Sequence, residues 1–255
     1  MTMASGVAGR APGRSQAGPR HSPDANGVRA VQVRAGGLGA AALNPLGGSA
    51  DVLVGRGAFI YLASQSPRRR QLLEQIGVAH RPLLADAEED VEALEAEIAG
   101  ELPAHYVERV TRAKLGAARR RLAQRRLPLA PILCADTTVA LGRRLLGKPR
   151  DAAQAIETLA LLAGRTHRVL TAVALWDGRR ARLALSTSRV RFAAMPSAVI
   201  EGYVASGEAF GKAGAYAIQG PIAAWIESIE GSYSGIMGLP LYETAQLLRQ
   251  AHVPR

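Results

Sequence analysis

Ordered patterns of apolar and polar residues begin at residue 59. The apolar run 59–63 predicts a short buried strand. Ser66 followed by Pro67 is typical of a helix start, so we expect a helix over residues 67–76. A second helix is predicted from about Pro103, where apolar residues recur at helical spacing.

The rest of the chain continues this alternation of strands and helices. A buried strand is expected at 131–135, running through Asp136 to residue 141. The later elements are a turn at 142–144, a helix at 151–162, two strands that flank Asp177-Gly178, a helix at 197–206, a glycine-rich segment at 211–220, a strand at 222–229, a turn at 231–235 and a last helix after Pro240 that ends near residue 251. This order predicts an α/β fold with helices on both faces of a sheet.

The composition is that of one globular domain with an extension. The chain has 255 residues, of which 48% are hydrophobic and 21% charged. Residues 1–58 are rich in Gly, Ala, Pro, Ser and Arg without periodicity, which predicts a disordered N-terminal extension; a start-site artefact is the alternative. Residues 59–255 form the predicted domain. Because no apolar stretch has the length of a membrane span or a signal peptide, we expect a cytoplasmic protein.

The charge balance favours an anionic partner. The net charge is +11, and much of the excess comes from arginines at 112–126, which look like one solvated helix. Aromatic residues make up only 4% of the chain, so few side chains could stack on a nucleic acid strand. The positive charge of the domain favours an anionic substrate, which can be a small molecule and need not be a nucleic acid polymer. Cys134 is the only cysteine, and we expect it to be a small buried hydrophobic residue.

The strand-turn-helix segment 62–69 is the first candidate site. A helix N-terminus offers free N–H groups and the positive end of its dipole to an anion. Arg68 and Arg69 stand in this first turn, where cations are unfavourable for the helix itself, so a bound polyanion would explain them. The alternative is a capped surface helix with solvated arginines.

Asp136 is the second candidate, because a carboxylate directly after an apolar strand is expected at or near the strand end. It could bind a divalent metal, take a proton from water, or cap a turn. Single lysines in helical or turn positions could bind phosphate or be solvated: Lys114, Lys148 and Lys212. An acidic cluster could hold Mg²⁺ or be a solvated loop: Glu88, Glu89 and Asp90. The sequence contains no Walker A pattern, dinucleotide fingerprint or metal-type histidine pair.

Taken together, residues 59–255 resemble the Maf family of nucleotide pyrophosphatases. The matching runs are LASQSPRR at 62–69, ADTTV at 135–139, LGKP at 146–149, KAGAYAIQG at 212–220, GSYS at 231–234 and GLP at 238–240. The resemblance implies a two-lobed α/β fold related to the inosine triphosphate pyrophosphatases, with a mixed twisted sheet and a nucleotide cleft. It also implies a divalent metal cation, Mg or Mn, as cofactor.

The resemblance carries roles to individual residues. Asp136 matches the catalytic residue that activates water for attack on the α-phosphate. The residues that match the phosphate-binding set are Ser66, Arg69, Lys114, Lys148 and Lys212. Glu89 matches the acidic residue near the metal, together with Asp136; Glu88 is the alternative. Two departures from the family pattern are Gly211, where many members have Asp, and the stretch 91–102, which is longer than usual.

Three positions match the selectivity determinants of the dTTP and UTP branch: Arg68, Thr137 and Gln219. The Gln219 amide can both donate and accept, which suits the edge of uracil or thymine. The resemblance therefore implies hydrolysis of dTTP and UTP to the monophosphate and pyrophosphate, in the removal of modified or non-standard nucleotides. The alternative is a nucleotide-binding regulator of cell division. We expect a nucleoside triphosphate as partner, no nucleic acid polymer and no membrane, with a homodimer left open.

Overall fold

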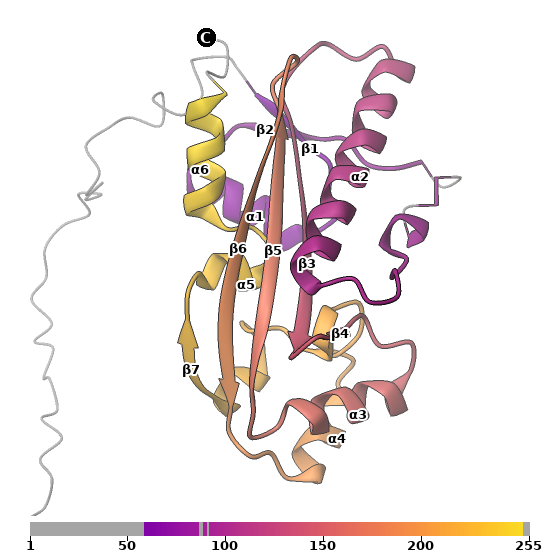
Figure 1. Ribbon diagram of the computed structural model, residues 1–255. Coiled ribbons are helices and arrows are strands. Elements are labelled where there is room, and N and C mark those ends of the chain that lie inside the picture. The colour runs from indigo at the N-terminus through magenta and orange to yellow at the C-terminus, as the bar shows by residue number, and fades with distance from the viewer. Residues whose placement is uncertain (1–58, 87–88, 91, 252–255) are drawn as a thin grey trace, which may run out of the picture. The chain divides into compact units, whose positions relative to one another are not determined.

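The computed structural model describes residues 59–86, 89–90 and 92–251. The predicted extension 1–58 and the alternative metal residue Glu88 lie outside the described residues. The described part forms a seven-stranded mixed sheet in the order β2-β1-β3-β5-β6-β7, with β4 paired to β3 (Figure 1). The strands are β1 (Ile60–Leu62), β2 (His80–Pro82), β3 (Ile132–Leu141), β4 (Arg144–Leu146), β5 (Thr166–Trp176), β6 (Ala181–Phe192) and β7 (Ile226–Glu230).

Helices cover both faces of this sheet, as the sequence predicted. They are α1 (Pro67–Gln75), α2 (Pro103–Gln124), α3 (Ala152–Leu162), α4 (Ser197–Ala205), α5 (Tyr233–Met237) and α6 (Leu241–Gln250), with short 3₁₀ turns η2 (Glu92–Glu95), η3 (Ala213–Ala215) and η4 (Pro221–Trp225). None of the helices built from the described residues is long and apolar enough to cross a membrane.

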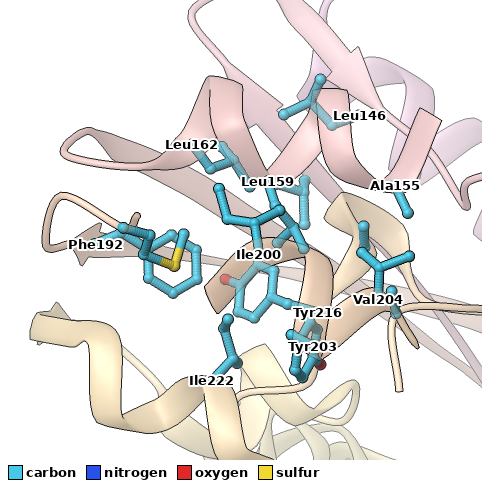
Figure 2. Packing of buried hydrophobic residues seen from close by; sticks show 14 of the residues in the cluster. Leu146, Ala155, Leu159, Leu162, Phe192, Ile200, Tyr203, Val204, Tyr216 and Ile222 are labelled. Carbon is cyan, nitrogen blue, oxygen red and sulfur yellow. The ribbon is translucent and has the colours of Figure 1, made fainter. Parts of the chain in front are cut away.

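Side chains alternate along β3, so the strand contributes residues to separate hydrophobic cores on the two faces of the sheet. On one face Ile132, Cys134 and Ala140 pack against α2. On the other face Leu133 and Ala135 pack with α1 and α6, while a separate cluster lies with α3 and α4 at the other end of the sheet. Figure 2 shows part of this last cluster, where residues of α3 and α4 gather with aromatic side chains. This face of the sheet therefore carries two separate hydrophobic clusters.

One edge of β3 is left open between two short neighbours. β1 pairs with Ile132 and Leu133, and β4 pairs with residues 139–141 on the same edge, because β5 occupies the opposite edge along residues 132–140. The described strands leave residues 134–138 unpaired on the first edge. β3 therefore continues through Asp136 to Leu141, as the sequence predicted. The expectation that Asp136 lies at or near a strand end was wrong, because the strand that ends beside it is β1.

Two other expectations were wrong. The segment predicted as a strand at 222–229 begins with the 3₁₀ turn η4, and β7 starts only at Ile226. Pro221 cannot donate a hydrogen bond to a sheet, and it opens this turn. The expected turn at 231–235 contains the start of α5, whose first turn is capped by Ser232 through a bond from the Gly235 N–H (3.0 Å).

The arginines at 112–126 are exposed, as the sequence predicted, except for Arg121. Arg121 is only 6% exposed, and its guanidinium donates to the Leu83 carbonyl (2.7 Å). Arg125 donates to the carbonyl of Leu84 (2.8 Å). These arginines hold the segment after β2 against α2, so their charge serves the fold. Cys134 is 1% exposed, which confirms its assignment as a buried residue, and burial raises the pKa of its thiol to about 12.

Candidate functional site

A cavity of about 560 Å³ opens beside the unpaired part of β3. This volume is in the range of small-molecule sites. The cavity takes side chains from both faces of the sheet, because no neighbouring strand closes that edge. Ten residues predicted from the sequence line it: Ser66, Arg68, Arg69, Glu89, Lys114, Asp136, Thr137, Lys148, Lys212 and Gln219.

The N-terminus of α1 forms one wall of the cavity. Ser66 caps the helix and accepts a bond from the Arg69 N–H (3.4 Å), and Pro67 is the first helical residue. Neither Asp nor Glu stands in the first turn of this helix. The positive end of the helix dipole and two arginines therefore face the cavity without an acidic residue in the first turn of α1 to offset them.

Arg69 is held rigidly by bonds to distant parts of the chain. Its Nε donates to the Gly238 carbonyl (2.7 Å), and its two terminal nitrogens lie 3.1 Å from Ser64 Oγ and 3.4 Å from Thr137 Oγ1. Among the described residues, these hydrogen-bond partners are all neutral oxygens. Burial lowers the pKa of Arg69, while the charge of Asp136 opposes that shift. The site thus contains an oriented cation available to an anion.

Thr137 is tied into the same network. Its hydroxyl lies 2.9 Å from Thr171 Oγ1, which in turn donates to the Gly235 carbonyl (2.7 Å). Thr137 lines the cavity, but these contacts also make it a support for Arg69. Any influence on substrate choice would therefore include an indirect part, through the guanidinium.

Asp136 meets Lys114 on the face covered by α2. Lys114 Nζ donates to Asp136 Oδ1 (2.5 Å) and to Glu95 Oε1 (2.6 Å). The second oxygen of Glu95 accepts from Lys148 Nζ (2.8 Å). Burial alone would raise the pKa of Glu95, but the charges and hydrogen bonds of the two lysines lower it below its ordinary value. Two carboxylates and two ammonium groups thus share one chain of contacts.

Glu95 was missed in the sequence, and Glu89 has a different environment from the one expected. Both oxygens of Glu89 accept bonds from Arg121, at distances of 2.7 to 3.0 Å. Glu95, at the end of η2, is the acidic residue that reaches Lys114 beside Asp136. The unusual length of the stretch 91–102 indicated that the acidic residues of this region could be placed differently from those of the family. No spacing rule predicts which of these acidic residues points into the cavity.

Lys212 is oriented by its own loop. Its Nζ donates to the Glu208 carbonyl (2.6 Å) and to the Phe210 carbonyl (3.4 Å), and it lies 3.7 Å from the Glu208 carboxylate. Glu208 therefore supplies a carboxylate near this lysine, although Gly211 replaces the Asp found in many relatives of the resembled family. The side chain of Lys212 is only 17% exposed.

The loop that carries Gln219 is fixed by close packing. Gly214 has φ +70°, and a Cβ there would lie 2.9 Å from Val139 Cγ2, so only glycine fits. The Gly214 N–H donates to the Gly147 carbonyl (3.1 Å), next to Lys148. Further along, the Ala217 N–H donates to the Tyr203 hydroxyl (3.2 Å). Gln219 itself is exposed and lines the cavity.

The donor set fits a divalent cation that is shared with a ligand. Among the described residues, no group of three or more His, Cys, Asp or Glu is arranged to hold a metal. Mg²⁺ is usually bound by one or two carboxylates together with substrate phosphates and waters. Asp136 and Glu95, which meet at Lys114, provide two such carboxylates.

Comparisons with known proteins identify the family. The family model described as Maf-like protein matches residues 59–251. A dTTP/UTP pyrophosphatase of Albidiferax ferrireducens is 62% identical over 191 residues, which are 75% of this chain and 96% of that relative. A dTTP/UTP pyrophosphatase of Polaromonas sp. is 63% identical over 193 residues, or 76% of this chain and 96% of the relative. A dTTP/UTP pyrophosphatase of Burkholderia pseudomallei is 60% identical over 197 residues, or 76% and 94% of the two chains.

The family match spans the part of the chain that forms the sheet, its covering helices and the cavity. The relatives align over nearly their whole length, so the similarity is not confined to a short motif. Fold, cavity and sequence similarity lead to one conclusion: the chain belongs to the Maf family.

Proposed function

We propose that the chain is a nucleoside triphosphate pyrophosphatase, a hydrolase of acid anhydrides that converts dTTP and UTP to the monophosphate and pyrophosphate. The observation that carries this proposal is the convergence of cations from four separate segments on one cavity beside Asp136. The names of relatives at 60 to 63% identity support the choice of dTTP and UTP. The regulatory alternative gains no support from these observations.

The cations would bind the triphosphate through its non-bridging oxygens. Arg69 presents a fixed guanidinium, and the lysines add point charges from α2 and from two loops. Because the cavity is partly desolvated, these charges act more strongly than they would in water. Their main effect is on the pyrophosphate leaving group, which gains negative charge as its bond to the α-phosphorus breaks.

Asp136 would act as the proton acceptor. A water oxygen attacks the α-phosphorus and gives its proton to the Asp136 carboxylate, while the bond from the α-phosphorus to the bridging oxygen breaks. The electron pair of that bond leaves with pyrophosphate. Lys114 holds Oδ1 of this carboxylate at 2.5 Å, which fixes its orientation and leaves Oδ2 for the water.

A divalent cation, Mg²⁺ or Mn²⁺, would neutralise phosphate charge and polarise the reacting phosphorus. Asp136 and Glu95 are the residues that would hold it. Glu89, the acidic residue expected from the sequence, would instead keep the segment after β2 in place through Arg121.

Gln219 would read the base and give the site its preference for uracil and thymine. Its amide can donate to O4 and accept from N3–H, and the packed loop around Gly214 limits where that amide can lie. Arg68 lines the same cavity and would add a contact near the phosphates or base. The proposed role is the removal of modified or non-standard nucleotides in the cytoplasm, where nucleoside triphosphates are found, without a nucleic acid polymer or membrane as partner; a homodimer is left open.

The direct test is a panel of nucleoside triphosphates, with Mg²⁺ or Mn²⁺, scored for both pyrophosphate and orthophosphate. We expect pyrophosphate with dTTP and UTP as the best substrates. Release of orthophosphate alone would exclude cleavage at the α-phosphate. Binding of nucleotide without any product would favour the regulatory role.

A further inference from the structure

We propose that Glu95 makes this site select the divalent-metal complex of the nucleotide over the metal-free triphosphate. The proposal rests on the proposed function, because it concerns the same cavity and the same ligand class. It starts from one observation: the carboxylate of Glu95 is bound at 2.6 Å by Lys114 and at 2.8 Å by Lys148. Two of the cations assigned to the triphosphate are therefore already engaged by an anion of the protein.

Glu95 is held in this position by its backbone. It ends the turn η2, and its carbonyl accepts a bond from the Tyr106 hydroxyl on α2 (2.9 Å). The next carbonyl, that of Ala96, accepts from Arg109 (2.9 Å), which also binds Glu101 through two nitrogens. Because η2 is anchored to α2, the Glu95 carboxylate would remain in the cavity after Lys114 and Lys148 bind the phosphate oxygens of the ligand.

The consequence depends on the charge of the incoming ligand. Phosphate oxygens that take Lys114 and Lys148 leave the Glu95 carboxylate without its partners, in a part of the site where its side chain is only 23% exposed. A metal-free triphosphate would add its own negative charge beside that carboxylate, and like charges repel strongly in such surroundings. The metal complex is less negative and brings a cation near Glu95 and Asp136. Nucleotide and metal binding should therefore be positively coupled through Glu95.

Glu92 offers a matched control. It lies on the same turn η2 and lines the same cavity, but it is exposed, and the structure gives it no ion pair with a described residue. Glu92→Gln and Glu95→Gln remove the same charge from the same turn. Only Glu95→Gln removes ion pairs with the two lysines, so a difference between the variants reports those ion pairs and not the total charge of the cavity.

The experiment measures the Kd of the α,β-methylene analogue of UTP by calorimetry, in EDTA and in Mg²⁺, for the full chain and both variants. We expect Mg²⁺ to tighten binding to the unmodified chain by at least about 10-fold, as for typical coupled sites. In Glu95→Gln, metal-free binding should become about 10-fold tighter, so that most of this preference is lost. Glu92→Gln should keep the preference. Glu95→Asp, which conserves the charge, should also keep most of it.

Three outcomes would overturn the proposal: an unchanged Mg²⁺ preference in Glu95→Gln, weaker metal-free binding in that variant, or an equal loss of preference in Glu92→Gln. Thermal melting of each variant establishes that it is folded before binding is interpreted. If the unmodified chain binds the analogue under neither condition, the proposed function itself fails. If it binds and Glu95→Gln behaves like the unmodified chain, only the role of Glu95 fails.

Discussion

Replacement of Asp136 by Asn tests the proposed chemistry most directly. The change keeps the size of the side chain and leaves one oxygen that can still accept from Lys114. Lys114 also keeps its contact with Glu95 at 2.6 Å, so the substitution does not leave a buried cation without a partner. The other cations of the cavity are untouched. We therefore expect a folded protein that still binds nucleotide.

The contacts of Asp136 determine how much the substitution should change the stability and the kcat of the protein. Removing one partner of a buried ion pair costs 3–5 kcal/mol when the other charge is orphaned, but here the cost should be about 1 kcal/mol, because Glu95 remains. For a domain of this size that corresponds to a fall in Tm of about 2–4 °C. Loss of the proton acceptor should lower kcat by at least about 100-fold, or about 2.7 kcal/mol in the barrier.

The assay is pyrophosphate release from UTP at saturating substrate, with thermal melting of the same samples. Asp177→Asn is a suitable control, because Asp177 accepts bonds from the N–H groups of Arg179 (2.8 Å) and Arg180 (2.7 Å) in the loop between β5 and β6, among residues that do not line the cavity. That variant should lose stability and keep its turnover. Near-normal kcat in a folded Asp136→Asn protein would remove Asp136 from the role of proton acceptor.

Three further predictions follow from the sequence and the structure. Gln219→Ala should lower kcat/KM for dTTP and UTP by an amount that corresponds to about 1–3 kcal/mol in activation free energy, and should affect kcat/KM for GTP much less. Lys148→Ala should lower kcat/KM for all substrates by a similar factor. A decrease by one common factor for all substrates in Gln219→Ala would contradict recognition of the base by Gln219. Deleting residues 1–58 should leave Tm and turnover nearly unchanged, because the family match begins at residue 59; a loss of several degrees would contradict that boundary. Burial lowers the pKa of His167 to about 4, below its value in the unfolded chain. The contribution of neutral His167 to the free energy of unfolding is therefore complete above about pH 6.5 and decreases as the pH falls toward 4. Denaturant unfolding at pH 7 and pH 5 should show a loss of about 2 kcal/mol that is absent in His167→Phe and retained in the exposed control His105→Gln.

Local sequence signals predicted elements whose ends are fixed by nearby residues. Ser66-Pro67 gave the start of α1 correctly, because capping depends on groups within one turn. The start of β7 was wrong, because apolar character alone does not distinguish a strand from a 3₁₀ turn that buries one side chain. Ile222 is 1% exposed within η4 and satisfies the same apolar pattern.

The strand through Asp136 was predicted correctly, but the expectation that this residue lies at or near a strand end was wrong for a related reason. Its local sequence, a carboxylate after an apolar run, is the same whether the strand ends or continues. What makes it accessible is that β1 stops at Leu62 and β4 begins to pair only at residues 139–141. That gap depends on how three strands pair with one another, so it cannot be predicted from the sequence of any one of them.

The sequence predicted most of the helices and strands, the family and ten of the residues that line the cavity, because these depend on short patterns and on similarity to related chains. The partners of the charged groups, in contrast, could be found only from the three-dimensional structure. Glu95 reaches Lys114 because η2 packs against α2, and the pairs Arg121–Glu89 and Glu95–Lys148 likewise join segments that are distant in the sequence. An ion pair depends on distances of a few ångströms between segments far apart in the chain, and sequence patterns do not specify such distances.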